Sequence, residues 1–119
     1  MASHNILGAQ GETAACRYLA LNGYTLLDRN WRYEHLELDI IAEFYGEIVF
    51  VEVKTRSDEN FAPALSSIDD AKMENIRKAA GAYLRKNGLD QPARIDAIVV
   101  IGSEPPFEIR HYKGTTGIL

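Results

Sequence analysis

Residues 36–56 read LELDIIAEFYGEIVFVEVKTR. Two short apolar runs, rich in β-branched residues, lie on either side of Tyr45-Gly46. This pattern predicts two antiparallel strands, at residues 36–44 and 47–56, joined by a tight turn. We expect this pair of strands to form the middle of a sheet, with the rest of the chain supplying the elements around it.

Charged residues end the second of these strands. Glu52 and Lys54 are two positions apart, so they lie on the same side of the sheet as the apolar Ile48 and Phe50. A strand that buries this much apolar surface has no structural need of a carboxylate and an ammonium group on one face. Glu52 and Lys54 are therefore candidate functional residues.

The hairpin register adds a second acid. If the turn contains two residues, Asp39 lies directly opposite Glu52, and Glu37 lies opposite Lys54. Two opposite carboxylates, about 5 Å apart at their β-carbons, repel each other unless a cation or a proton lies between them. A ladder of salt bridges on a solvated face is the alternative, but three acids and one lysine balance poorly.

A further acid, Glu12, lies on a helix predicted at residues 5–22. Its face of that helix carries small or apolar residues, namely Gly8, Ala15, Cys16 and Leu19. A carboxylate on such a face is either partly buried or directed at a site. Periodicity alone slightly favours an ordinary surface glutamate with small neighbours.

The remaining pattern predicts the order αβββαββ and an α/β fold. Ser67 followed by Asp70 is a capping signal for a long second helix, which suits a right-handed crossover between two parallel strands. We therefore expect a mixed sheet flanked by helices, in one domain over residues 1–119. The other predicted elements are strands at residues 24–32, 94–101 and 107–112, the helix at 68–87, a loop at 60–67 and a flexible tail at 113–119.

Composition limits the class of protein. The 119 residues have an ordinary apolar content of 46% and no apolar run long enough to cross a membrane. The start of the chain lacks a signal peptide pattern, and Cys16 is the single cysteine, so we expect a cytoplasmic protein without an internal disulfide. The three histidines lack the spacing of a metal site, and we interpret them as structural or solvated.

The net charge of −4 argues mildly against nucleic-acid binding, which is usually associated with a basic surface. The objection is weak, because part of this charge would belong to the site and a bound divalent cation would offset it. Basic residues also cluster locally, although solvated surface is the safer interpretation of any one cluster. One such group is Lys72, Arg77 and Lys78, followed by Arg85 and Lys86.

Two carboxylates and a lysine suit metal-assisted hydrolysis of a phosphodiester. Mg²⁺ binds oxygen ligands and usually holds one or two protein carboxylates, which Asp39 and Glu52 could supply. The metal would activate a water molecule and stabilise charge on the phosphate. Lys54 could orient that water, help to deprotonate it, or neutralise the developing charge.

The motifs along the chain together resemble those of the YraN family of bacterial proteins. That family belongs to the PD-(D/E)xK nuclease superfamily, which has the restriction-endonuclease-like fold, and the order of the acids is similar to that of archaeal Holliday-junction resolvases. The motifs that carry the resemblance are Gly8-x-x-Gly11-Glu12, Gly23-Tyr24, Asn30-Trp31-Arg32, residues 37–42, residues 50–56, Lys72, Ala79-Ala80, Tyr83-Leu84 and Arg94-Ile95-Asp96.

The resemblance implies a Mg²⁺-dependent DNA endonuclease, with Mn²⁺ as a substitute and branched DNA among its candidate substrates. A non-catalytic module that binds nucleic acid or a DNA-processing partner is the alternative, and a homodimer would suit an enzyme that cuts two strands. The implied roles are Asp39, Glu52 and the backbone carbonyl of Val53 as metal ligands, Lys54 as catalytic lysine, Glu12 as an additional catalytic acid, and Glu37, Arg56 and Lys72 as auxiliary residues.

Overall fold

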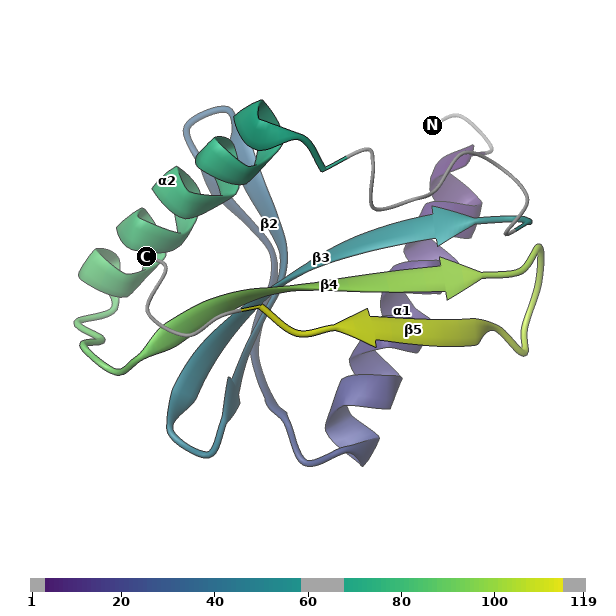
Figure 1. Cartoon of the computed structure of the whole chain (residues 1–119), viewed down its shortest axis with the longest axis horizontal. Helices are drawn as coiled ribbons and strands as arrows, with labels where there is room; N and C mark the ends of the chain where they lie inside the picture. The colour runs from purple at the N-terminus through teal and green to yellow at the C-terminus, as the bar shows by residue number, and fades with distance from the viewer. Residues whose placement is uncertain (1–3, 59–67, 115–119) are drawn as a thin grey trace.

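The computed structural model describes residues 4–58 and 68–114, and its elements follow the predicted order αβββαββ (Figure 1). The predicted loop at residues 60–67 and the tail residues 115–119 lie outside the described residues. The elements are α1 (His4–Leu21), β1 (Thr25–Tyr33), β2 (Leu36–Phe44), β3 (Glu47–Arg56), α2 (Asp70–Lys86), β4 (Ala93–Ile101) and β5 (Glu108–Tyr112).

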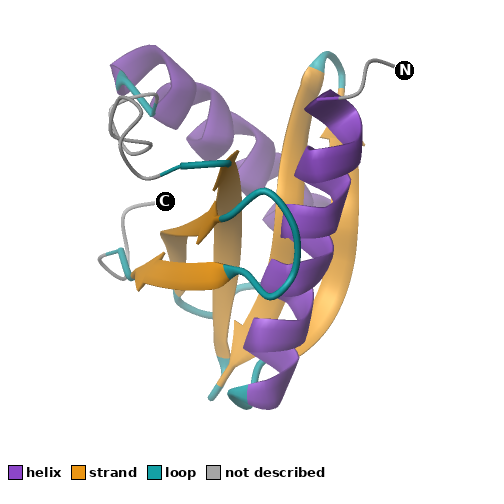
Figure 2. Ribbon diagram, turned by 90° about the vertical axis from the view of Figure 1, so that its right-hand side faces the viewer, coloured by secondary structure: helices purple, strands orange, loops and turns teal. Residues whose placement is uncertain are grey.

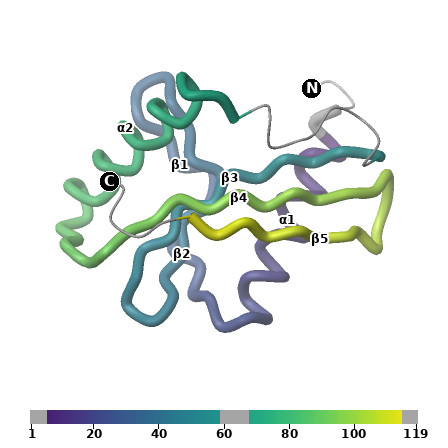
Figure 3. Tube along the Cα trace, in the orientation of Figure 1, coloured from purple at the N-terminus to yellow at the C-terminus, as the bar shows by residue number. Residues whose placement is uncertain are grey.

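The strands form one sheet in the order β1-β2-β3-β4-β5. The pairing of β3 with β4 is parallel and the other three pairings are antiparallel, which confirms the predicted mixed sheet and the crossover through α2. The sheet is strongly twisted, so β1 and β2 run at a large angle to the later parts of β3 and β4 (Figure 3).

The two helices cover opposite faces of this sheet, as the view in Figure 2 shows. On the α2 side, Ile76 and Tyr83 of α2 pack against strand residues such as Leu38 and Phe50. On the α1 side, Ala15, Cys16 and Leu19 pack against another set of strand residues: Ile40, Ala42, Val49, Val51, Ile98 and Val100. The α/β layer fold of the restriction-endonuclease-like type is thus confirmed.

The turn between β2 and β3 has the predicted two residues. Tyr45 and Gly46 both have positive φ angles, of 50° and 81°, as a type I′ turn requires at its two central positions. Phe44 therefore pairs with Glu47, and the predicted register continues along the ladder.

The start of α2 differs from the prediction. Asp69 is the N-cap residue, and its carboxylate accepts a hydrogen bond of 2.8 Å from the backbone N–H of Lys72. The predicted cap, Ser67, lies outside the described residues. Among the helices that the structure describes, none is long and apolar enough to cross a membrane.

Candidate functional site

Asp39 lies where the regular alternation of β2 shifts by one residue. Leu38 belongs to the core on the α2 side, but Ile40 belongs to the core on the α1 side and Ile41 again to the α2 side. In a regular strand, residues 38 and 40 would share a face. The shift lies next to Asn30 of β1, which has a positive φ of 55°. The neighbours of Asn30 pair with Ile40 and Leu38, the residues on either side of Asp39.

The ladder between β2 and β3 ends just before the two predicted acids. Its last pair is Ile40 with Val51, so the predicted direct pair of Asp39 with Glu52 is not part of the ladder, and this detail was wrong. The reason is a side-chain contact, because Oδ2 of Asp39 accepts the backbone N–H of Val53 at 2.8 Å. A carboxylate thus occupies the place where a backbone carbonyl would continue the ladder.

Glu52 is a buried carboxylate between two lysines. It is only 5% exposed and lies on the α2 side of β3, as the alternation predicted. Its Oε2 atom is 3.0 Å from Nζ of Lys72 on α2 and 3.7 Å from Nζ of Lys54 on its own strand. The structure therefore brings Glu52, Lys54 and the auxiliary candidate Lys72 together.

The charges of this group shift one another's pKa values. Burial and the neighbouring Glu52 carboxylate raise the pKa of Asp39 to about 8. Burial lowers the pKa of Lys54, although the charge of Glu52 acts in the opposite direction. Burial also acts to lower the pKa of Lys72, but the hydrogen bond and charge of Glu52 raise it overall. Burial and the adjacent negative charge therefore favour a proton or a cation beside Asp39.

A cavity of about 300 Å³ opens between β2, β3 and the first turns of α2. Asp39, Glu52 and Lys72 line it, as does the auxiliary candidate Glu37. Its other lining residues are His35, Leu36, Asn75 and Ile76. Neither His35 nor Asn75 was among the predicted site residues.

The spacing of Asn75 could have revealed its position, because it lies one helical turn after Lys72. His35 had no such signal: it lies in the turn between β1 and β2, which the twist of the sheet brings to the cavity. The interpretation of His35 as structural or solvated did not include this position, since His35 is exposed and also lines the cavity.

Glu12 lies near this group but outside the cavity lining. Its Oε1 atom accepts a hydrogen bond of 2.9 Å from Nε of Arg29 on β1, and its side chain is 15% exposed. The charge of Glu12 still contributes, as the smallest cause, to the raised pKa of Asp39. The preceding residue, Gly11, explains this closeness, because a Cβ at that position would overlap the side chain of Thr55 on β3.

Two predicted auxiliary residues make other contacts. Glu37 is exposed and pairs with Arg32 of β1 at 3.4 Å, so it does not form the predicted pair with Lys54. The guanidinium of Arg56 donates a hydrogen bond to the backbone carbonyl of Thr55. Glu37 nevertheless lines the cavity, whereas Arg56 does not.

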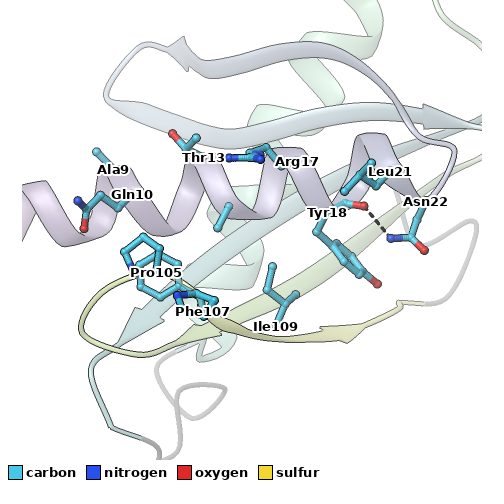
Figure 4. Close-up of a pocket in the computed structure, with 12 residues that line it drawn as sticks. Ala9, Gln10, Thr13, Arg17, Tyr18, Leu21, Asn22, Pro105, Phe107 and Ile109 are labelled. Carbon is cyan, nitrogen blue, oxygen red and sulfur yellow. Dashed lines mark hydrogen bonds between the residues drawn. The ribbon is translucent and has the colours of Figure 1, made fainter.

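A larger cavity, of about 770 Å³, lies between α1 and the segment that enters β5 (Figure 4). Of the described residues that line it, only Arg17 is charged, and apolar side chains such as Leu21, Phe107 and Ile109 dominate. Asn22 closes one end by donating a hydrogen bond to the carbonyl of Tyr18. The smaller cavity is more polar and contains the predicted acids, so it is the candidate site.

The residues around the smaller cavity fit a Mg²⁺ ion. Asp39 and Glu52 are the one or two carboxylates that this ion usually takes from a protein, with water and substrate oxygens completing its shell. Among the described residues, no group of three or more His, Cys, Asp or Glu side chains is placed to hold a metal.

Comparisons with known proteins place the chain in one family. The model of the family described as "Uncharacterised protein family UPF0102" matches residues 11–100. A UPF0102 protein of Bacteroides fragilis is 45% identical over 113 residues, which cover 95% of this chain and 93% of the relative. A UPF0102 protein of Bacteroides thetaiotaomicron is 47% identical with the same coverage, and one of Neisseria gonorrhoeae is 39% identical over 90% of this chain and 94% of its own length. These matches confirm the resemblance to the YraN family, and the chain is a member of the UPF0102 family.

Proposed function

We propose that this protein is a metal-dependent nuclease that hydrolyses phosphodiester bonds in DNA. The observation that carries the proposal is the convergence of Asp39, Glu52 and Lys72 at one cavity between β2, β3 and α2, with Nζ of Lys54 3.7 Å from the Glu52 carboxylate. Both acids are held in position by the fold, since the carboxylate of Asp39 accepts a hydrogen bond from the backbone N–H of Val53 and Glu52 is buried.

The carboxylates of Asp39 and Glu52 would hold the ion. In the structure Oδ2 of Asp39 accepts the N–H of Val53, and Oε2 of Glu52 faces the two lysines. In a strand, the C=O of a residue points to the same side as its N–H, so the carbonyl of Val53 faces β2 and suits the third ligand that the resemblance implies.

When bound, Mg²⁺ supplies positive charge to the phosphate oxygens and lowers the pKa of a water molecule. The lysines act on the substrate side of this arrangement. Nζ of Lys54 can hydrogen-bond the attacking water or the phosphate, and its lowered pKa makes proton exchange at Nζ easier. Lys72 neutralises Glu52 and adds positive charge at the edge where a phosphate would enter.

A non-catalytic binding module is the second candidate, and one observation favours it. Lys72 lies 3.0 Å from Glu52, so the buried carboxylate already has a protein cation as its partner. In that case the acids and lysines would form an internal ion-pair network and the cavity would hold no metal.

A cleavage assay separates the two functions. The substrates are linear, nicked and four-way-junction DNA, each with Mg²⁺, with Mn²⁺ or with a chelator. The proteins are the wild type, Asp39→Asn, Glu52→Gln and the control Glu108→Gln, which removes an exposed acid on β5. We expect metal-dependent cleavage by the wild type and the control, and a loss of at least about 100-fold, or about 2.7 kcal/mol, in both site variants.

The relative rates on the three substrates would identify the preferred structure. Cleavage that persists in chelator, or that survives both site substitutions, would contradict the nuclease mechanism. DNA binding by the wild type without cleavage on any of the substrates would favour the second candidate.

A further inference from the structure

The solvent-facing side of α2 is basic although the whole chain is acidic. Between residues 70 and 86 this helix carries five basic residues and two acidic ones, a local charge of +3 in a chain of net charge −4. The acids are Asp70 and Glu74. The bases are Lys72, Arg77, Lys78, Arg85 and Lys86. Positive charge is thus concentrated on the helix that also supplies Lys72 to the candidate site.

Part of this basic face surrounds a groove of about 630 Å³, called here the α2 groove. Its lining includes Glu74, Asn75, Arg77, Lys78, Gly81 and Arg85. Residues 74, 78, 81 and 85 follow the spacing of one helix face, so the groove runs along the helix rather than around it.

Gly81 keeps the middle of the groove open. A Cβ atom at this position would meet only the far end of the Arg85 side chain, at 3.3 Å. Glycine in a helix interior costs about 0.5–1 kcal/mol relative to alanine, so this residue is not explained by helix stability. Its effect is to let a ligand approach the backbone of α2 between two basic side chains.

The α2 groove adjoins the candidate site. Asn75 lines both the groove and the cavity that holds Asp39 and Glu52. A molecule that leaves the cavity past Lys72 would therefore meet Asn75 next, and then Lys78 and the rest of the groove.

Two cations of the groove are available to a ligand. Lys78 and Arg85 form no ion pair with any residue that the structure describes, and Arg77 has only a long contact of 3.5 Å with Glu74. Arg85 lies in the last turn of α2, where a cation also offsets the helix dipole. That explanation does not extend to Lys78, which lies in the middle of the helix.

We propose that the α2 groove binds the phosphate backbone of a DNA strand that extends from the candidate site. The inference rests on the proposed function, because it identifies where the uncleaved part of the substrate lies. The helix rises about 1.5 Å per residue, so Lys72 and Arg85 are about 20 Å apart along its axis. That length matches about six nucleotides of one strand at about 3.4 Å each.

The test is DNA binding in the presence of a chelator, measured by fluorescence anisotropy with a labelled duplex and a labelled four-way junction. The groove variant is Lys78→Ala/Arg85→Ala. The matched control is Arg17→Ala/Lys113→Ala, which removes two exposed cations from other parts of the chain. Each protein is titrated from about 50 to about 200 mM salt, because each phosphate contact adds about 0.9 to the slope of log K against log salt.

We expect the groove variant to lose at least about tenfold in affinity and about two units of the salt slope, while the control changes less than about threefold. Gly81→Glu is a second variant, which places a carboxylate in the open groove. It should also lose at least about tenfold, and the exchange of glycine for a better helix former should not weaken the fold. Thermal unfolding of each variant checks that it remains folded.

Equal losses in the groove variant and the control would overturn the proposal, as would unchanged binding by both the groove variant and Gly81→Glu. Failure of the nuclease proposal would look different. DNA binding through the α2 groove without any cleavage would contradict only the nuclease proposal. Cleavage and binding that are unchanged by the groove substitutions would contradict only the groove proposal.

Discussion

The carboxylate of Asp39 accepts the backbone N–H of Val53 at 2.8 Å, across the point where β2 and β3 stop pairing. This contact holds an acid from one strand against the backbone of the next, and it brings Asp39 beside Glu52 without a direct cross-strand pair. The same contact turns the carbonyl side of Val53 toward Asp39. The end of the ladder is therefore what creates the site.

The raised pKa of Asp39 predicts a pH-dependent stability in the absence of metal. Between about pH 4 and pH 8 the folded chain holds a proton on Asp39 that the unfolded chain has released, so the free energy of unfolding falls as pH rises. The slope from this group is at most about 1.4 kcal/mol per pH unit. Urea unfolding in chelator at several pH values measures it.

Asp39→Asn is the control for this slope, because an amide does not titrate in this range. Its stability should vary less with pH than that of the wild type. The predicted shift would be contradicted if the free energy of unfolding changed between pH 5 and pH 8 by the same amount in the wild type and in Asp39→Asn.

Lys72 should compete with a divalent cation for Glu52. Its Nζ lies 3.0 Å from Oε2 of Glu52, so Lys72→Met removes a positive charge from beside the bound ion. We expect the affinity for Mn²⁺ to rise at least about fivefold. Two like unit charges about 4 Å apart repel each other by about 1 kcal/mol even in water, and the substitution removes this repulsion. Lys78→Met removes a cation farther along α2 and should change the affinity less than about twofold. A lower affinity in Lys72→Met would contradict this role.

Gly11 should be required for the close approach of α1 to β3. In Gly11→Ala the new Cβ would overlap Oγ1 and Cγ2 of Thr55, and overpacking of this kind typically costs about 1–3 kcal/mol. Thr55→Ala removes both of those atoms. The double variant should therefore recover most of the loss, which a double-mutant cycle by urea unfolding measures. Additive losses in the cycle would show that the two residues do not limit each other.

The buried network around Asp96 should matter for stability. Asp96 is 1% exposed and accepts hydrogen bonds from Arg94 at 2.9 Å and from the backbone N–H of Gly114 at 3.0 Å, with the His111 ring nitrogen at 2.7 Å. Asp96→Ala removes one buried partner of Arg94, which keeps its ion pair with Glu47 at 2.6 Å, and leaves the N–H of Gly114 unpaired, so it should cost about 1–3 kcal/mol in urea unfolding. The exposed Glu108→Ala should cost less than about 1 kcal/mol. Similar costs for the two variants would contradict the assignment.

The strands around the site were predictable because their signals are local. The turn residues Tyr45-Gly46 and the apolar runs beside them specify a two-residue hairpin, and its register then follows. The face on which Glu52 lies was predicted correctly for the same reason. Alternation along β3 is regular, so Glu52 lies on the same side as Ile48 and Phe50, and no contact with a distant part of the chain is needed to place it there.

The details at Asp39 were not predictable, because they depend on contacts between distant parts of the chain. The shift in β2 coincides with the positive φ of Asn30 on another strand, and the bond to Val53 replaces a ladder contact that simple pairing rules assume. The ion pair of Glu12 with Arg29 likewise depends on how α1 crosses β1. Sequence patterns therefore identified the acids, whereas tertiary packing determined their partners.

The most direct test of the account is whether Asp39 and Glu52 together hold one divalent cation. Mn²⁺ binding can be followed by electron paramagnetic resonance with the wild type, Asp39→Asn, Glu52→Gln and the control Glu108→Gln. We predict one saturable Mn²⁺ per chain in the wild type and the control, with the affinity at least about tenfold lower in each site variant. The absence of saturable Mn²⁺ binding by the wild type, or equal binding by all four proteins, would contradict the metal site.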